Sequence, residues 1–584
     1  MIQFQLLDIS ADDILIDGVP KFIITLYGKT GIDNNGFNKN IVCHIEGFKP
    51  YFYLKYPDHW GPDQVKNCFF GTRYLNIEDL IHDKKNSQIC DSYEFYGYHQ
   101  ENDQEKQYKF IKLQFINFVN MKKCIKMIKE YCKKYYENVN IKNEDEKEKV
   151  TEFINLCKEN ECYRFDSNLY ESNIHPILRF IHEYNIKTCG WIQIENEKEV
   201  NPDDKRFNVD LEYEYLNIKK SKIKSIDIKD INKFIIASFD IECDSSHGDF
   251  PNPIKDLRKL CIDIVDYFKS NDYIIDCDDN NLTIKHVKDC INNSMNDNDE
   301  YINKLYLENG PISDKSIDDI LNKNTDKICE LLKNSNKSSI LREKCVKDLN
   351  KLLCYLKNEC DKKVVVTGDP VIQIGVVFHR YGDIEPYDRS IVVMGPRSNM
   401  DKSEICDDLE NINVYRCQDE KELLLKWKDL ILKHNPDYIT GYNIFGFDFD
   451  YIIKRVSVLF KCVYCKSKFN WFTKQPEITH HINCESHAFF RLGRLMKNQV
   501  NDYFENINLD NETITSKKVN GSEYFKYKEK KCNTVIKRLG NQKEDDNDFA
   551  QNTLKYIHMD GRIIFDVQNE VKKNTSLDSY KLYK

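Results

Sequence analysis

The sequence predicts an α/β protein with a separate α+β domain at its amino-terminal side. The first 137 residues are rich in strand signals such as "KFIITLYGKTG", and a Lys-rich helical pattern follows them. Further along, short apolar stretches alternate with amphipathic helical ones, which is typical of a sheet covered by helices. Strands are expected at 234–242, 371–379, 390–395 and 438–442, and helices at 419–434 and from about 448.

The order of these elements narrows the fold class. Three sequential strands, a helix, a strand and a helix are the order of a ribonuclease H-like sheet. The change of pattern near Phe234 places the boundary between two domains. We therefore expect an amino-terminal domain at 1–230 and a second domain at 231–584.

Composition limits the classes of protein that fit. The chain has 584 residues, of which 41% are hydrophobic and 31% charged, and a net charge of −9. No apolar stretch reaches the roughly 18 residues of a membrane span, and the start lacks the pattern of a signal peptide. The 22 cysteines are scattered through predicted elements, which favours reduced thiols in an intracellular protein over a disulfide framework. A charge this close to balance allows a nucleic-acid partner without requiring one.

Two polar stretches interrupt the predicted sheet domain. The stretch at 255–362 is rich in Asn, Asp and Lys and is helical in parts, and a second stretch covers about 500–550. We expect both to be surface insertions, the first of them partly disordered and without visible chemistry.

The stretch "KFIIASFDIECDSS" ends an apolar strand with two acids. Strand side chains alternate between faces, so Asp240 and Glu242 should project together while Ile241 points into the core. Two neighbouring carboxylates repel each other unless a cation holds them, and oxygen ligands suit Mg²⁺ or Mn²⁺. The alternative is that both acids simply face water at a strand end.

A second acidic candidate lies in "HNPDYITGYNIFGFDFDYIIKRV". Asp448 falls in the first turn of the predicted helix, where it could be a metal ligand or simply an acid that stabilises the helix start. Asn443, at the end of the preceding strand, could bind substrate or brace the turn. If Asp240, Glu242 and Asp448 converge, they would hold two metal ions that activate water against a phosphodiester.

The chain resembles the family B DNA polymerases, of the eukaryotic delta type and of large DNA viruses. "SFDIEC" with "GDFPNP" is similar to their first exonuclease motif, and "PDYITGYNIFGFD" to the second. "GFKPYFYLKYP", "YESNI", "GDPVIQIG" and "GRIIFDVQNEV" match other ordered segments of the family. The resemblance implies a ribonuclease H-like 3′→5′ exonuclease that proofreads DNA.

The same resemblance assigns roles to residues. It implies that Asp240, Glu242 and Asp448 are catalytic ligands of Mg²⁺ or Mn²⁺, and that Asn443 and Phe447 bind substrate. The partners it implies are a single-stranded 3′ end and a primer–template, with deoxynucleoside triphosphates and a sliding clamp for the complete enzyme. If the protein is viral, the host cytoplasm or nucleus is the expected location.

The segment "FFRLGR" offers two basic side chains beside aromatic ones. Arg491 and Arg494 could contact phosphates while the aromatic rings stack on bases. The alternative is a packed aromatic pair with solvated arginines.

Parts of the family pattern are missing. The third exonuclease motif, Tyr-x-x-x-Asp, is not found in its expected place, because the chain ends at "SLDSYKLYK" before reaching it, and the polymerase palm motifs are absent. We therefore expect the amino-terminal part of a replicative polymerase, with an incomplete exonuclease domain. An inactive DNA-binding scaffold is the alternative.

The piece 461–488 is longer than the family pattern allows. It contains a C-x₂-C at Cys462 and Cys465 and a C-x₂-H at Cys484 and His487, with His480 and His481 as alternative ligands. This spacing suits a structural Zn²⁺ that would fasten an insertion lacking its own core. Ordinary reduced cysteines in a loop are the alternative.

Overall fold

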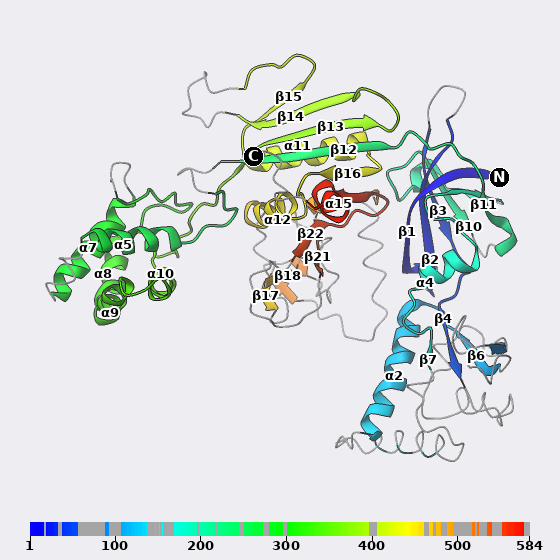
Figure 1. Ribbon diagram of the computed structural model, residues 1–584, viewed down its shortest axis with the longest axis horizontal. Helices are drawn as coiled ribbons and strands as arrows, with labels where there is room; N and C mark the ends of the chain where they lie inside the picture. Colours follow the sequence, from blue (N-terminus) through cyan, green and yellow to red (C-terminus); the bar gives the residue numbers. More distant parts are fainter. Residues whose placement is uncertain are drawn as a thin grey trace.

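The structure is a computed structural model with three parts: an amino-terminal part, a central sheet and a helical lobe (Figure 1). It describes residues 1–16, 19–32, 38–55, 88–92, 107–136, 147, 151, 155, 169–195, 198–215, 219–244, 250–271, 279–295, 301–395, 406–460, 466–470, 475–479, 488–495, 517–519, 522–524, 534–539 and 552–576. Among these residues no helix combines the length and the apolar character that crossing a membrane requires. The cysteines whose side chains the structure describes are reduced and form no disulfide.

The amino-terminal part contains a seven-stranded sheet in the order β11-β8-β1-β2-β3-β10-β9. Its strands are β1 (Ile2–Ile16), β2 (Val19–Thr30), β3 (Asn40–Ile45), β8 (Trp191–Ile194), β9 (Lys198–Glu199), β10 (Leu211–Tyr215) and β11 (Ile223–Ile226), with short 3₁₀ turns at Pro202–Asp204 and Lys220–Lys222. The long β1–β2 hairpin forms the middle of the sheet because alternate apolar side chains, such as Phe4 and Leu26, are fully buried.

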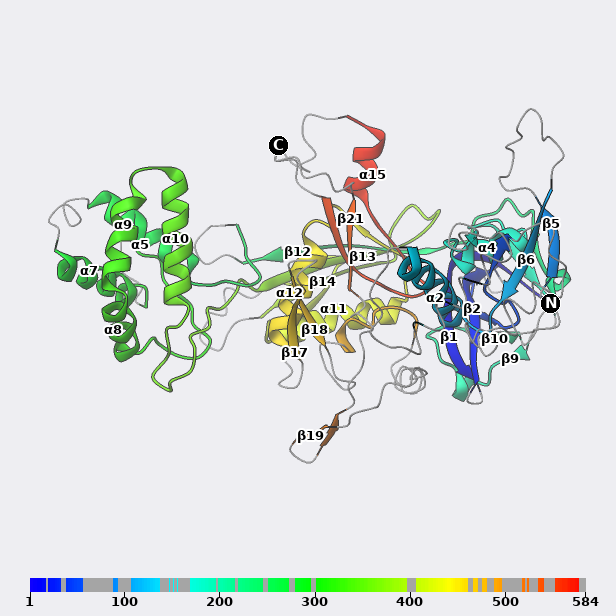
Figure 2. The same cartoon turned by 90° about the horizontal axis from the view of Figure 1, so that it is seen from below.

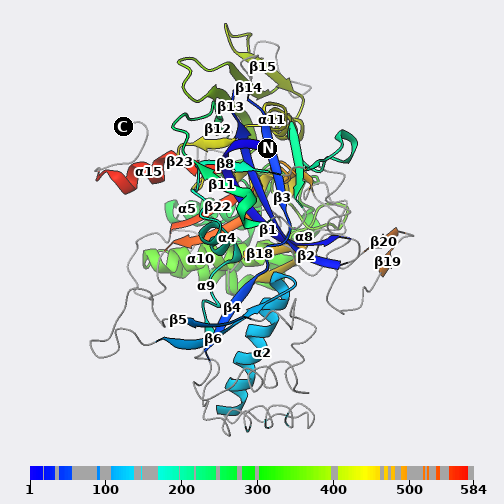
Figure 3. The same cartoon turned by 90° about the vertical axis from the view of Figure 1, so that its right-hand side faces the viewer.

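A smaller four-stranded sheet, β5-β6-β4-β7, lies beside this one at the lower end of the amino-terminal part (Figure 3). It is made of β4 (Tyr51–Lys55), β5 (Gln88–Ser92), β6 (Tyr108–Gln114) and β7 (Leu169–Tyr170), with helices α2 (Phe118–Tyr136) and α4 (Pro176–Glu183) nearby. The predicted strand-rich start and the Lys-rich helix are therefore both present.

The central sheet has the order β15-β14-β13-β12-β16-β23. Its strands are β12 (Ile235–Cys243), β13 (Val371–Arg380), β14 (Asp388–Met394), β15 (Asn413–Cys417), β16 (Tyr438–Gly441) and β23 (Ile563–Asp566). β12, β13 and β14 form an antiparallel meander, and β16 and β23 continue the sheet in parallel to β12. Apart from the added β15, this is the ribonuclease H-like arrangement that the sequence predicts.

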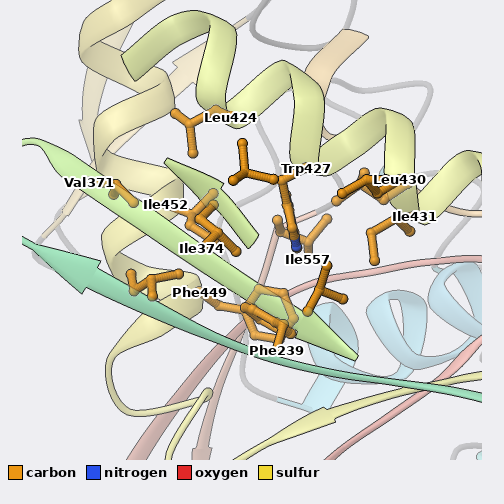
Figure 4. Packing of buried hydrophobic residues seen from close by; sticks show 14 of the residues in the cluster. Phe239, Val371, Ile374, Leu424, Trp427, Leu430, Ile431, Phe449, Ile452 and Ile557 are labelled. Carbon is orange, nitrogen blue, oxygen red and sulfur yellow. The ribbon is translucent and has the colours of Figure 1, made fainter. Parts of the chain in front are cut away.

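Helices α11 (Glu420–His434) and α12 (Asp448–Leu459) cover one face of the central sheet. The core between them is centred on the fully buried Trp427, whose ring lies 5.3 Å from that of Phe239, and Phe449 and Ile452 fill the space toward α12 (Figure 4). This core fixes which side of β12 faces inward. The opposite side of the strand is consequently left open.

The insertion at 255–362 forms a helical lobe with a core of its own (Figure 2). Its helices are α5 (Arg258–Ser270), α7 (Asn280–Asn293), α8 (Asp314–Lys323), α9 (Thr325–Ser335) and α10 (Ser339–Leu353). Side chains such as Ile264, Leu332 and Leu349 are fully buried between them. The polar composition led us to expect partial disorder, whereas the described residues pack one apolar stripe per helix against its neighbours.

The two connections of the lobe to the central sheet are joined side by side. Asp369 donates its backbone N–H to the carbonyl of Asn252 at 2.9 Å, and its carboxylate accepts the N–H of Asn252 at 2.8 Å. Lys255 forms an ion pair with the same carboxylate at 2.6 Å. These contacts close the base of the lobe next to the end of β12.

A buried ion cluster joins the amino-terminal part to the central sheet. Asp437, just before β16, pairs with Lys29 of β2 and, at 2.6 Å, with Arg494. All three side chains are almost fully buried, and Asp437 also accepts the backbone N–H of Ile235 at 2.7 Å. Attraction to both cations holds the pKa of Asp437 below its ordinary value despite burial.

The remaining described elements are short. They are β17 (Lys466–Asn470), β18 (Gln475–Thr479), β19 (Lys517–Val519), β20 (Ser522–Tyr524), β21 (Thr534–Leu539), β22 (Asn552–Ile557) and helix α15 (Val567–Asn574).

Candidate active site

The open side of β12 carries the two predicted strand acids. Along the strand, Phe239 and Ile241 are buried, while Asp240 and Glu242 are exposed. The alternation follows from the pleat, since the apolar residues meet the core around Trp427. Both carboxylates therefore lie on the side of the sheet away from the helices.

Asp448 is the first residue of α12 and lies against the same strand. Its side chain is only 2% exposed, and its carboxylate accepts the backbone N–H of Ile241 at 3.1 Å. The helix begins here because the turn Asn443–Phe447 reverses the chain directly after β16. Asp448, about 200 positions further along the sequence, thus contacts β12 between Asp240 and Glu242.

Asp240 and Asp448 form a carboxyl pair. Burial and the neighbouring charge of Asp240, to which Asp448 is hydrogen-bonded, raise the pKa of Asp448 to about 7. Two carboxylates in contact cannot both ionise cheaply, so Asp448 keeps its proton up to about pH 7 when no cation is bound. Sites of this kind favour a cation that replaces the proton.

Glu242 lies on the same side of β12 but is not part of this pair. Within the described residues, no three His, Cys, Asp or Glu side chains are close enough to one another to hold a metal ion. The pairing with β13 shifts register between Glu242 and Cys243, and such bulges change the direction in which a side chain points. The structure therefore brings together two of the three predicted acids and leaves the third nearby on the strand.

The turn before α12 depends on an acid that the sequence analysis missed. Asp566, at the end of β23, is 2% exposed and accepts the backbone N–H groups of Asn443 and Phe445, both at 2.9 Å. It also caps α15 by accepting the N–H of Gln568. Asn443 has a φ of 62°, a left-handed conformation that Asn tolerates better than most residues. The signal was present in "GRIIFDV", an apolar strand ending in acid as in β12.

Aromatic side chains border the acids. Phe447, the residue before Asp448, is half-buried and lies 5.2 Å from the ring of Tyr451. Phe250, which follows β12, is 74% exposed, and its ring lies 5.6 Å from that of Phe447. Phe250 was not among the predicted site residues, although it belongs to the quoted "GDFPNP".

The structure separates the two predicted DNA-contacting arginines. Arg494 is 0% exposed and pairs with Asp437, so it belongs to the ion cluster and its predicted contact with DNA is wrong for this structure. Arg491 is half-buried, and Phe489 and Phe490 pack into the core. The packed aromatic pair is therefore the arrangement found, and a DNA contact by Arg491 stays a prediction.

The predicted zinc ligands lie outside the described residues. Cys462, Cys465, Cys484 and His487 all fall in segments that the structure does not describe. The zinc hypothesis is therefore untested.

An open sheet face with paired carboxylates at a strand and a helix start defines a nuclease-type ribonuclease H-like domain. The family described as "DNA polymerase family B, exonuclease domain" matches residues 167–299 and 323–525. More than half of the chain is covered, and the chain therefore belongs to the family B DNA polymerases, whose exonuclease domain it contains.

Individual relatives agree with this assignment. The chain is 30% identical over 490 residues to a DNA polymerase of Phaeocystis pouchetii virus, covering 74% of this chain and 43% of that protein. It is 27% identical over 604 residues to a DNA polymerase of Pyramimonas orientalis virus, covering 96% of this chain and 39% of that one. The DNA polymerase delta catalytic subunit of Caenorhabditis elegans is 38% identical over 91 residues, which are 16% of this chain and 8% of that subunit.

The chain thus spans about two fifths of the length of the curated relatives that match it over most of its residues. The solved structure of a family B DNA polymerase from Pyrobaculum calidifontis aligns with 82% of this chain and with 35% of its own chain, at 13% identity and a TM-score of 0.36. A similarity this low carries no argument about the fold, which rests on the strand order itself.

Proposed function

We propose that this chain is the amino-terminal and proofreading portion of a replicative DNA polymerase, and that its exonuclease removes mispaired nucleotides from DNA 3′ ends. The observation that carries the proposal is the contact between Asp240 of β12 and the largely buried Asp448 at the start of α12, which come from distant parts of the sequence. The family membership supports the same activity. On this proposal residues 1–230 form the amino-terminal domain and 231–584 the exonuclease domain.

The donor set suits divalent cations with oxygen ligands, Mg²⁺ or Mn²⁺. The pKa of Asp448 is raised to about 7 by burial and by the neighbouring Asp240, and a cation bound between the two carboxylates would relieve this repulsion. Asp240 and Asp448 would hold the ion, and Glu242 would join them from the same side of β12. When bound, such ions lower the pKa of water and stabilise the leaving oxygen of a phosphodiester.

The chain's own side chains position the strand to be cut. Phe250 and Phe447 present aromatic rings beside the acids, where the last bases of a single strand can stack. Asn443, held in its left-handed conformation by the contact of its N–H with Asp566, offers an amide for hydrogen bonds to the DNA. Stacking orients the 3′ end so that its terminal phosphodiester lies near Asp240 and Asp448.

The experiment compares 3′ trimming of a labelled single-stranded oligonucleotide by the wild-type chain and by Asp240→Ala and Glu242→Ala, with Mg²⁺ present. Both changes should reduce trimming at least about 100-fold, because each removes a ligand of the cation. Asp244→Asn, an exposed acid one residue beyond β12, is the matched control and should trim normally. Undiminished trimming by Asp240→Ala would remove the proposal.

A non-catalytic DNA-binding scaffold is the second candidate, favoured by the separation of Glu242 from the carboxyl pair. It predicts that the wild-type chain binds the oligonucleotide but never shortens it, with either Mg²⁺ or Mn²⁺. The same assay therefore separates the two functions. Polymerisation, the use of deoxynucleoside triphosphates and a sliding clamp are proposals for the complete protein only.

A further inference from the structure

A pocket lies at the junction between the amino-terminal sheet and the central sheet. It has a volume of about 560 Å³, within the range of small-ligand sites, and is lined mainly by aromatic and aliphatic side chains. Its aromatic members are Trp191, Phe234, Tyr381, Tyr438 and Phe565. We call it the junction pocket.

The junction pocket opens on the same side of the central sheet as the exonuclease acids. Ile236 of β12 lines the pocket, and it is an even-numbered residue of the strand like Asp240 and Glu242. Tyr438 of β16 is the direct neighbour of Ile236 in the sheet. Ile236 and Asp240 are four residues, or about 13 Å, apart along β12 and point to the same face of the sheet, so the pocket and the acids share that face.

The face between Ile236 and Asp240 remains uncovered by the described residues. Ser238 of β12 and Val377 of β13, which are paired with each other, are both exposed there. Thr440 of β16, which is paired with Ser238, is buried, so the uncovered part of the face runs along β12 and β13.

The chemistry of the pocket fits a planar, weakly polar group. The rings of Phe234 and Tyr438 lie 5.6 Å apart, edge to face, and those of Tyr438 and Phe565 lie 6.3 Å apart. The indole N–H of Trp191 already donates to the carbonyl of Asp230 at 2.7 Å, and the amide N–H of Gln5 donates to the carbonyl of Cys189 at 3.2 Å, while Asp230 is the acidic residue of the lining. Lys229 lies at the pocket as a cation able to contact a phosphate.

We propose that the junction pocket binds one unpaired nucleobase of the single-stranded DNA whose 3′ end occupies the exonuclease site. This inference rests on the proposed exonuclease function and adds an upstream contact to it. A base held there would lie about four nucleotides from the 3′ end in a stacked strand, and fewer in an extended one. Such a contact favours DNA with several unpaired terminal nucleotides, as a frayed mispaired end has.

The test uses single-stranded oligonucleotides of eight thymidines, each with one abasic position between the first and sixth nucleotide from the 3′ end. Their affinity for the wild-type chain is measured by fluorescence anisotropy in EDTA, so that no strand is cut. The expected result is a loss of about tenfold when the abasic site falls at one position two to four nucleotides from the end, because base–aromatic stacking is lost there.

Two exposed residues of one loop provide the variant and its control. Tyr381, 48% exposed, lines the pocket, whereas Ile384, 94% exposed, does not. Tyr381→Ala should bind the intact oligonucleotide about tenfold more weakly and lose the position-specific effect, and Ile384→Ala should behave as wild type. Photocrosslinking of 5-iodouracil at the sensitive position to Tyr381 or Tyr438 gives a second readout that does not depend on a mutation.

The outcomes separate this inference from the proposed function. The junction-pocket proposal is overturned if no abasic position lowers the affinity, or if Tyr381→Ala binds as tightly as wild type and no crosslink forms. Both results are expected if a segment of the protein, and not a base, fills the pocket. If the wild-type chain still trims the oligonucleotides with Mg²⁺, the exonuclease proposal stands. If a sensitive position is found but no trimming occurs, the exonuclease proposal fails instead.

Discussion

The carboxylate of Asp448 accepts the backbone N–H of Ile241 at 3.1 Å, in the middle of the strand segment that carries the other two acids. This bond ties the start of α12 to β12, next to Asp240. The backbone of the strand thus holds the carboxylate of Asp448, a proposed metal ligand, in place.

The carboxyl pair predicts an unusual dependence of stability on pH. The pKa of Asp448 is raised from 3.8 to about 7 in the folded chain, so between these pH values the folded state holds a proton that the unfolded state has lost. In EDTA, the melting temperature should therefore fall by a few degrees as the pH rises from about 4 to 7. Differential scanning fluorimetry at several pH values measures this.

Mg²⁺ should reverse that loss at pH 8 and have little effect at pH 5, where the pair keeps its proton. The control is Asp448→Asn, which should remove both this pH dependence and the stabilisation by Mg²⁺. An equal rise of the melting temperature with Mg²⁺ at both pH values would contradict the raised pKa of Asp448.

Phe250→Ala should weaken binding of single-stranded DNA at the exonuclease site. The side chain is largely exposed, so its loss should not affect folding, while the stacking that it offers next to Phe447 disappears. The KM for trimming should rise about tenfold with a smaller change in kcat. Ile254→Ala, an exposed residue of the same segment, is the matched control, and an equal effect of both changes would argue against stacking.

Asp566→Ala should reduce the kcat of trimming more than it changes KM for DNA. The change frees the N–H groups of Asn443 and Phe445, so the turn that delivers Asp448 loses its support. Asp566→Asn keeps an oxygen that can accept one of these bonds and should recover part of the activity. Equal loss in both variants, with lowered melting temperatures, would indicate a purely structural role.

Asp437→Ala should lower the free energy of unfolding by about 3–5 kcal/mol, because Lys29 and Arg494 would remain buried without a counter-charge. Asp383→Ala, which breaks the exposed pair with Lys233, should change the free energy of unfolding far less. Chemical denaturation of both variants gives the comparison. Similar values would mean that the buried cluster does not couple the two parts of the fold.

The sequence predicted the central sheet closely because its strands and helices follow a regular apolar period. The expected helix start at 448 and the alternation along β12 are both confirmed. Arg494 was misassigned because the sequence does not reveal that its side chain is buried and pairs with Asp437, more than fifty residues earlier in the chain.

Asp566 and the core of the helical lobe were missed for a related reason. Asp566 ends an apolar strand, as the acids of β12 do, but its partners are backbone N–H groups of a turn more than 100 residues away, which the sequence does not reveal. In the lobe, each described helix shows only a narrow apolar stripe. These stripes form a core only because the helices pack against one another, which the sequence of a single helix does not show.

The clasp between Asn252 and Asp369 means that the chain enters and leaves the helical lobe at nearly the same point. The two chain segments that connect the lobe to the sheet are already paired with each other. The lobe can therefore be shortened or replaced by another domain without changing the spacing between β12 and β13. A variant in which a short glycine linker replaces the lobe should keep the metal-dependent trimming of the intact chain.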